Sequence, residues 1–436
     1  MSTTTFEFPY GDEVVKLALP TRQILSDIRG SKAVAVTDVP AAVREALRNP
    51  IGCAPLAQTV KAGDQVAILV SDITRAYVKF DQFLAVLLDE LNTAGVPDSD
   101  IFIVIALGAH RMNTDAEIVT ICGADVCHRI KVVQHDTHDK DNLVYVGTTP
   151  RGVESYANKQ VMAADKVILT GGIVYHLMSG FGGGRKAVMP GISGYDSIQA
   201  NHRFCLNAVV GQGLNPNCGS GMVRENEMAL DMADIAALVN PDFLLNAVFT
   251  PEGDFARFVA GHWLAAWEEG CREVERINGI PVDGQADLTI ASAGGYPKDI
   301  NLYQAIKPID NAYMATKPGG VAIMFMECRD IMEPPEYSEW LSIKDPLQFE
   351  LALRKQFTVP GYSAFRLTHI ARQITLIGVS KPENAEFLRN AGIIPVTDYA
   401  AAMEIASQKL GRANYTINVM TQAASTVPLV RRAAKE

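Results

Sequence analysis

Several features that assign proteins to familiar classes are missing from this chain of 436 residues. Basic residues are the minority, with 39 Lys and Arg against 49 Asp and Glu, so the chain has no excess of positive charge for nucleic acid. The seven cysteines form no C-x-x-C pair and are odd in number, which argues against a disulfide framework and favours a reducing compartment.

Membrane and export signals are missing too. No apolar run approaches the roughly 18 residues that span a bilayer. The first residues, MSTTTFEFPYGDEVVKL, lack the basic start and apolar core of a signal peptide. We therefore expect a cytoplasmic protein with neither a membrane nor a nucleic-acid partner.

Common catalytic and phosphate-binding motifs are also absent. The sequence contains no G-x-S-x-G elbow and no H-E-x-x-H helix. The stretch GFGGGRKAVMPGIS (180–193) is not a P-loop, because Lys186 follows Arg185 and Ala187 stands where magnesium needs a hydroxyl. It formally matches G-x-G-x-x-A, but no strand leads directly into it and no acidic residue follows about 20 positions later. Neither motif explains why three glycines precede Arg185 and Lys186.

What the chain does have is an alternation of short apolar runs with helical stretches. Such runs are typical of strands buried on both faces, as in parallel sheets covered by helices. They occupy residues 65–75, 101–111, 131–136, 166–176, 288–297, 320–330 and 374–380. Residues 78–95 have leucines at helical spacing and close on a glycine, which predicts a helix. The pattern predicts an α/β fold with mainly parallel sheets.

The length and one internal boundary predict two α/β domains. A long helical segment at 255–277 is followed by a Gly- and Pro-containing stretch at 278–287. We expect an N-terminal catalytic domain at 1–277 and a C-terminal domain at 288–436, whose last residues could return to the first. Ligands of open α/β sheets bind beyond the carboxyl ends of strands, so the active site is expected in the interdomain crevice.

Polar side chains follow several of the predicted strands. Asp72, Thr74 and Arg75 come after one strand, His110 after the next and His176 after another. A structural role is the simpler interpretation of a lone histidine, but the small residues beside His110 leave space for a ligand. Residues at equivalent strand ends can converge on one site.

Two later segments carry further candidates. His202 is expected on or just after a helix that starts near Gly194, close enough in sequence to share a ligand with Lys186. In NLYQAIKPID a helix would present Tyr303, Gln304 and Lys307 on one face. The pair His135 and His138 in HDTH has metal-like spacing, but its polar surroundings favour a solvated loop.

Together these stretches make the sequence similar to the lactate racemase family, whose members use a nickel-pincer nucleotide. The resemblance rests on SDITR at 71–75, GAHR at 108–111, GGIVYH at 171–176, GFGGGRKAVMPGIS at 180–193, ANHR at 200–203 and GGYPKDINLYQAIK at 294–307. The stretches occur in the family's order over most of the chain.

The resemblance implies a covalent cofactor. Lys186 would be joined through a thioamide to a pyridinium-3-thioamide-5-thiocarboxylate mononucleotide, and His202 would be the protein ligand of its nickel, a ligand type that suits Ni(II). The resemblance further assigns cofactor contacts to Asp72, Thr74, Gly183, Gly184, Arg185 and Tyr303. It also implies separate cofactor-maturation enzymes as partners.

The resemblance implies hydride transfer from C2 of a 2-hydroxy acid, which gives a flat keto acid instead of a costly carbanion. His110 and His176 would be the two acid–base groups, because imidazole titrates near neutral pH. Arg75, Lys307 and Gln304 would bind the substrate, with Arg75 and Lys307 supplying charge for its carboxylate.

Departures from the family pattern leave the substrate open. The family loop is nearer Asp-His-Thr-Arg-Pro, whereas this chain has Ile73 and then Ala76-Tyr77-Val78, and Ala109 replaces a threonine. The substrate is a small, lactate-type 2-hydroxy acid or another such acid: malate, 2-hydroxyglutarate, a longer aliphatic acid or an aldonate. A non-catalytic nucleotide- or metal-binding homologue is the third alternative. The aromatic residue that lines the substrate side chain is Trp340, Phe357 or Phe365.

Overall fold

A computed structural model describes residues 2–31 and 33–430, and the chain divides into two compact units. The central unit comprises Lys32–Cys205 and Asn215–Glu275. The terminal unit comprises Met1–Ser31, Leu206–Leu214 and Arg276–Glu436. These ranges differ from the expected 1–277 and 288–436, because the described N-terminal residues 2–31 associate with the C-terminal half of the chain.

The central unit is built on a six-stranded sheet of order β13-β12-β9-β4-β5-β6. Its strands are β4 (Val66–Ser71), β5 (Ile101–Ala106), β6 (Lys131–Gln134), β9 (Lys166–Ile173), β12 (Phe243–Phe249) and β13 (Phe255–Gly261). All pairs are parallel except β12–β13. The apolar runs predicted at 65–75, 101–111, 131–136 and 166–176 thus contain strands, and β4 and β9 are buried nearly throughout.

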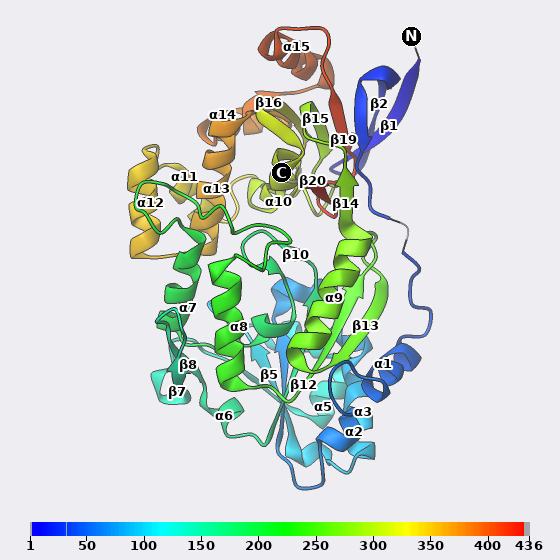
Figure 1. Cartoon of the computed structure of the whole chain (residues 1–436), viewed down its shortest axis with the longest axis vertical. Coiled ribbons are helices and arrows are strands. Elements are labelled where there is room, and N and C mark those ends of the chain that lie inside the picture. The colour runs from blue at the N-terminus through cyan, green and yellow to red at the C-terminus, as the bar shows by residue number, and fades with distance from the viewer. Residues whose placement is uncertain (1, 32, 431–436) are drawn as a thin grey trace, which may run out of the picture. The chain divides into compact units, whose positions relative to one another are not determined.

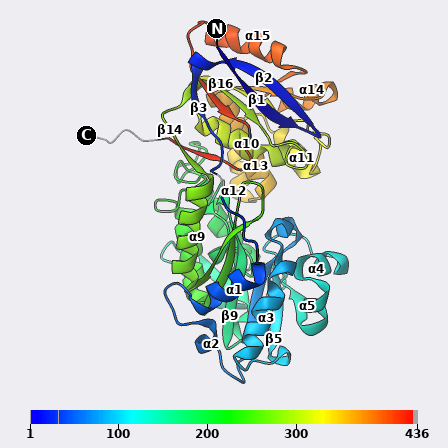
Figure 2. The same ribbon diagram turned by 90° about the vertical axis from the view of Figure 1, so that its right-hand side faces the viewer.

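Helices and two small antiparallel ribbons complete this unit. The helices are α1 (Val39–Arg48), α2 (Leu56–Thr59), α3 (Leu84–Thr93), α4 (Asp115–Cys122), α5 (Ala124–Arg129), α6 (Lys159–Met162), α7 (Tyr195–His202), α8 (Glu227–Val239) and α9 (Trp263–Asn278), the last ending in the terminal unit. The ribbons are β7 (Leu143–Thr148) with β8 (Glu154–Asn158), and β10 (Tyr175–His176) with β11 (Gly180–Phe181). Figure 2 shows α3, α4 and α5 grouped beside β5.

One helix prediction in this unit was wrong. Residues 255–277 were expected to form one helix, but residues 255–261 form β13 and the helix begins only at Trp263. Phe255 and Phe258 are buried in the core of the central unit as edge-strand residues. Antiparallel pairing with β12 satisfies the backbone of this segment, a long-range contact that outweighs its local helical pattern.

The terminal unit is built on a parallel six-stranded sheet of order β18-β17-β16-β15-β19-β3. Its strands are β3 (Ile24–Asp27), β15 (Ala286–Ser292), β16 (Thr316–Phe325), β17 (Thr375–Val379), β18 (Ile394–Val396) and β19 (Ile417–Met420). The hairpin of β1 (Thr3–Tyr10) and β2 (Glu13–Pro20), drawn in blue in Figure 1, packs on this sheet, with Phe6 and Phe8 in the core.

Among the described residues, the terminal unit also has a short parallel pair of strands and six α-helices. The pair is β14 (Gly279–Val282) with β20 (Val427–Val430). The helices are α10 (Leu302–Met314), α11 (Pro335–Leu341), α12 (Pro346–Lys355), α13 (Val359–Gln373), α14 (Ala385–Asn390) and α15 (Tyr399–Leu410). Across residues 2–31 and 33–430, no helix combines the length and apolar character that crossing a bilayer requires.

Candidate active site

The first cluster of polar side chains lies at the carboxyl end of β4. Asp72 is buried, and its two carboxylate oxygens accept hydrogen bonds from Thr74 Oγ1 at 2.7 Å and from His110 Nδ1 at 2.8 Å. Arg75 Nη1 donates to Thr74 Oγ1 at 3.2 Å. Burial raises the pKa of Asp72, but His110, Thr74 and Arg75 together outweigh it and lower this pKa below its usual value. The carboxylate is therefore ionised at neutral pH.

This carboxylate determines the tautomer of His110. An ionised carboxylate only accepts hydrogen bonds, so His110 Nδ1 carries the proton and Nε2 keeps its lone pair. The His110 side chain is 42% exposed, while Asp72 behind it is 4% exposed. An imidazole that is backed by a buried carboxylate is arranged to take up a proton at Nε2.

The glycine-rich stretch packs tightly against its own unit. Gly183 and Gly184 have φ of 66° and 52°, in the left-handed region that side chains disfavour. A Cβ at Gly184 would lie 2.4 Å from Trp267, and one at Gly183 would lie 2.6 Å from Asn246 Oδ1. Gly184 N also donates to Asn246 Oδ1 at 2.8 Å. Both glycines are therefore required by the packing of the loop itself.

Arg185 anchors this loop from inside. The side chain is 1% exposed, its guanidinium lies 3.9 Å from the centre of the Trp267 ring, and it donates to the carbonyls of Ala229 and Ser179. Burial lowers its pKa to about 10. Nη1 is buried and has no hydrogen-bond partner among the described residues. The predicted contact of Arg185 with a cofactor stays a prediction.

Lys186 points the other way, toward His176 on β10. Its Nζ lies 3.1 Å from His176 Nε2. On the far side of the ring, His176 Nδ1 accepts hydrogen bonds from the backbone N–H groups of Met178 and Ser179, both at 3.2 Å. Burial, and then the positive charges of Arg75 and Arg185, lower the pKa of Lys186 to about 7.

His202 is the last residue of α7, the helix expected to start near Gly194. The imidazole is 3% exposed and its Nδ1 lies 3.0 Å from the carbonyl oxygen of Ile198, one helical turn earlier. A carbonyl only accepts, so Nδ1 carries the proton and Nε2 presents a lone pair that can bind a metal. Burial, and then the positive charges of Lys186 and His110, lower the pKa of His202 to about 3.

The central unit therefore brings together most of the predicted site residues. Lys186 contacts His176. The charges of Lys186 and of His110 both lower the pKa of His202. Arg75 acts electrostatically on Lys186. Within the described residues no group of three or more His, Cys, Asp or Glu side chains is arranged to hold a metal.

The remaining predicted residues lie on α10 in the terminal unit. Asn301 caps this helix by accepting from the N–H of Gln304 at 2.9 Å. Lys307 Nζ donates to Gln304 Oε1 at 3.2 Å, and the Tyr303 ring packs edge-on against Tyr337 at 5.5 Å. The helix expected to carry Tyr303, Gln304 and Lys307 is present.

Comparison with known proteins decides the family. Residues 10–212 match the lactate racemase N-terminal domain, and residues 282–427 match the lactate racemase C-terminal domain. A lactate racemase from Thermoanaerobacterium thermosaccharolyticum is 31% identical over 97% of this chain and 98% of its own length. A lactate racemase from Lactiplantibacillus plantarum is 34% identical over 66% of each chain.

This chain belongs to the lactate racemase family. It is accordingly an enzyme of the racemase class, an isomerase. The structure of the lactate racemase apoprotein from T. thermosaccharolyticum matches 98% of the chain and all of its own, with a TM-score of 0.87 at 30% identity. A protein from Thermotoga maritima matches 92% of the chain with a TM-score of 0.60, but at 14% identity it shows only a shared fold.

Two features of this region were not predicted from the sequence. Asn246 and Trp267 hold the glycine loop, yet nothing in their local sequence marks them for this role. The expectation of a solvated HDTH loop was wrong for His135, which is fully buried and bonded to the Ser193 carbonyl and Asn158. His138 is exposed, and its ring is tilted by 35° against that of Tyr195, with the ring centres 4.5 Å apart.

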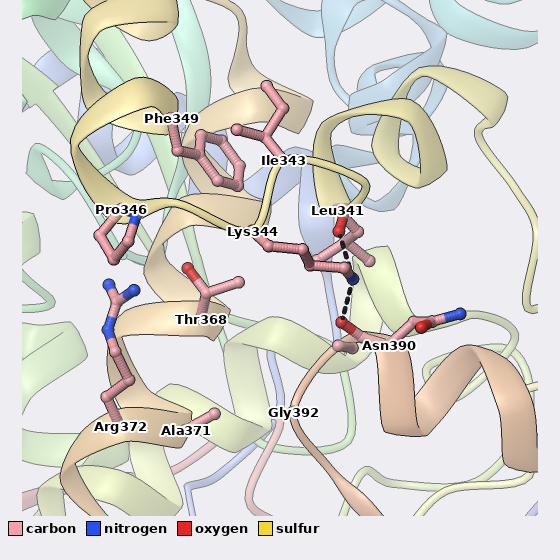
Figure 3. Close-up of a pocket in the computed structure, with 11 residues that line it drawn as sticks. Leu341, Ile343, Lys344, Pro346, Phe349, Thr368, Ala371, Arg372, Asn390 and Gly392 are labelled. Atoms are coloured by element: carbon pink, nitrogen blue, oxygen red, sulfur yellow. Dashed lines mark hydrogen bonds between the residues drawn. The ribbon is translucent and has the colours of Figure 1, made fainter.

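A cavity of about 230 Å³ in this racemase lies elsewhere, in the terminal unit (Figure 3). It is lined mainly by apolar residues of α11, α12, α13 and the end of α14. Lys344 Nζ beside it already donates to the carbonyls of Leu341 and Asn390. None of the predicted site residues lines this cavity, so it gives no support to a second catalytic centre.

Proposed function

We propose that this chain is a nickel-dependent racemase of a small, lactate-type 2-hydroxy acid. The observation that carries the proposal is the match to a lactate racemase over 97% of the chain, with residue types suited to the chemistry at each position the resemblance assigns. Malate, 2-hydroxyglutarate, a longer aliphatic acid or an aldonate are the alternative substrates.

The residues of the central unit fit the cofactor that the family implies. Lys186 supplies an amine with a pKa lowered to about 7, so that a large share of it is neutral and able to form a covalent bond. His202 presents Nε2 with its lone pair, and imidazole nitrogen suits nickel. In this proposal His202 is the one protein ligand, and the cofactor supplies the others.

When bound, the nickel-pincer nucleotide would accept a hydride from C2 of the substrate and return it. In this proposal His110 Nε2 takes the hydroxyl proton of one enantiomer while the C2–H bond breaks. The Asp72 carboxylate then stabilises the imidazolium through Nδ1–H. Proton transfer by a positioned imidazole is typically worth about 10² to 10⁴ in rate.

His176 is proposed as the second acid–base group, which serves the other enantiomer. Its Nε2 approaches Lys186 Nζ in the cofactor-free chain, so it lies beside the position of the attached cofactor. Arg75 and Lys307 are proposed to bind the substrate carboxylate, with Gln304 hydrogen-bonded to Lys307. Asp72, Thr74, Gly183, Gly184, Arg185 and Tyr303 remain proposed cofactor contacts.

The test is to produce the chain together with a set of cofactor-maturation enzymes and, separately, without them. The matured protein should gain a mass equal to the nucleotide and bind nickel, and it should racemise at least one acid of a panel that includes lactate, malate and 2-hydroxyglutarate. A matured chain that carries cofactor but racemises none of these acids would favour the non-catalytic alternative.

A further inference from the structure

The ring of His176 is held in one tautomer by its own loop. Two backbone N–H groups, those of Met178 and Ser179, point at Nδ1 from 3.2 Å. A protonated Nδ1 would face two donors, so Nδ1 is the acceptor and a neutral His176 carries its proton on Nε2.

The tautomer of His176 determines the protonation state of Lys186. His176 Nε2–H is a donor, and Lys186 Nζ at 3.1 Å must accept from it. An ammonium group has three donors and no acceptor, whereas a neutral amine has a lone pair. The contact therefore selects the neutral form of Lys186.

The surroundings of Lys186 favour the same form. Arg75 and Arg185 disfavour an added positive charge on Lys186, and Cys205 has an opposite and smaller effect. His202 also interacts electrostatically with Lys186, but its own pKa is lowered to about 3, so it is neutral in this pH range. Burial disfavours the ammonium further. The hydrogen bond and the electrostatics thus agree.

We propose that His176 is a positioning residue for Lys186 before the cofactor is attached: its Nε2–H holds Nζ as a neutral amine, ready to be acylated. The inference deepens the function proposed above and rests on it for the identity of the acyl group. In the acylation, Nζ forms a bond to the acyl-type carbon and the bond from that carbon to its leaving group breaks. The proton lost from nitrogen departs with the leaving group, and nothing is oxidised or reduced.

Acylation then changes the state of His176. The nitrogen of an amide or thioamide shares its lone pair with the adjacent carbon, so it no longer accepts a hydrogen bond. The hydrogen bond between Lys186 and His176 is therefore a feature of the cofactor-free chain. The Nε2–H tautomer of His176 belongs to that state, because a proposed base role for Nε2 after attachment requires the proton on Nδ1.

Competitive acylation of the cofactor-free chain tests the proposal. The chain is labelled with trace N-acetoxysuccinimide from pH 6 to pH 10, and each lysine is quantified by peptide mass spectrometry with exposed Lys355 and Lys409 as references. The pH midpoint is independent of how easily the reagent reaches the site. We expect a midpoint near 7 for Lys186, against about 10.4 for an ordinary lysine.

Removal of the donor should raise that midpoint. A hydrogen bond of this kind is worth about 1 kcal/mol, so His176→Ala should lower the reactivity of Lys186 at pH 6.5 roughly fivefold. His138→Ala removes an exposed imidazole and should leave the Lys186 midpoint unchanged. A wild-type midpoint above 9, or an unaltered midpoint in His176→Ala, overturns the proposal.

A second measurement needs no variant. Nitrogen-15 chemical shifts of the histidine rings in the cofactor-free chain should show His176 with its proton on Nε2, and a proton on Nδ1 would overturn the inference. Neither measurement uses cofactor or substrate. A chain that passes both and still fails to racemise any acid would contradict the proposed function alone.

Discussion

At the residue scale, the proposal makes Lys186 Nζ the single atom on which cofactor attachment depends. Lys186→Ala removes Nζ, so the chain matured with cofactor enzymes should lose the mass of the nucleotide completely. The fold should survive, since the loop is anchored by Arg185 and its glycines and not by this side chain. Intact-mass spectrometry checks this, with Lys307→Ala as the matched control that keeps the adduct. Retention of the adduct in Lys186→Ala would refute the attachment site.

The lowered pKa of Lys186 also has a consequence for stability. The folded pKa, about 7, is below the unfolded value of about 10.4, so the unfolded chain binds more protons between these two pH values. Stability of the cofactor-free chain therefore rises with pH across this window. Lys186→Met has no titratable group at this position, so its free energy of unfolding should exceed that of the wild type at pH 7. This difference should shrink toward pH 10.

Urea unfolding at pH 7 and pH 9.5 measures that difference. Lys355→Met, at an exposed site, should show no comparable change in advantage between the two pH values. A Lys186→Met advantage that grows with pH would mean that the folded chain favours the ammonium form.

His202 is proposed to bind nickel through a single atom, so its loss should separate metal from organic cofactor. His202→Ala, matured in the same way, should retain the mass of the nucleotide on Lys186 and lose most bound nickel, because a vacant protein ligand weakens the site. Elemental analysis beside intact mass distinguishes the two. Full nickel content in this variant would assign the ligand role to another residue.

Among single residues, sequence was informative where a motif fixed several positions at once. His202 ends the helix expected for it, His110 follows β5, and His176 follows β9 in the short strand β10. His135 was misjudged, because its polar neighbours suggested solvent while its actual partners, Ser193 and Asn158, are distant in sequence. Burial of a polar residue depends on such partners, which a local pattern does not reveal.

At the element scale, the glycine loop is sensitive to one methyl group. Gly184→Ala would introduce a Cβ 2.4 Å from Trp267 at a φ of 52°. Left-handed backbone costs about 1–2 kcal/mol for a non-glycine residue, and overpacking costs about 1–3 kcal/mol more. We therefore expect the free energy of unfolding to fall by roughly 2–5 kcal/mol, as measured by urea denaturation.

Gly284→Ala is the matched control, because a Cβ there meets no atom within 4 Å. Its free energy of unfolding should change little. Equal losses in the two variants would show that the close approach to Trp267 is not what requires glycine at position 184.

The buried parallel strands were the elements most readable from sequence. Their continuous apolar runs reflect burial on both faces, a property that each strand carries in its own residues. The edge strand β13 was missed, because Phe255–Gly261 runs almost directly into α9 and its pairing with β12 is not encoded locally. Edge strands depend on the partner that they add to, so short-range periodicity describes them poorly.

At the scale of the whole molecule, the N-terminal segment also depends on long-range contacts that a local sequence pattern does not reveal. Residues 2–31 were expected in the first domain because they are adjacent to it in sequence. Instead β3 pairs with β19, nearly 400 positions later, and Phe8 packs on Phe325. Only the three-dimensional structure reveals that the first and last described segments, residues 2–31 and those up to 430, lie in the same unit.

In the proposed mechanism racemisation depends on the whole catalytic cycle, because a proton leaves the hydroxyl group and a hydride leaves C2, and both must return to give the other enantiomer. His110→Ala and His176→Ala should each reduce complete racemisation by about 10²- to 10⁴-fold. Steady-state kinetics do not reveal which histidine serves which enantiomer. The two enantiomers have equal free energy in water, so kcat/KM must be equal in both directions for any variant.

A single turnover of matured protein avoids this constraint. Each variant, mixed with one enantiomer at a time, should still oxidise the enantiomer whose hydroxyl faces its remaining histidine and form bound keto acid, seen as a change in cofactor absorbance. The two variants should therefore respond to opposite enantiomers. His138→Ala, outside the site, should respond to both. A response of both histidine variants to the same enantiomer would contradict the two-base arrangement, because either imidazole would then serve that one enantiomer.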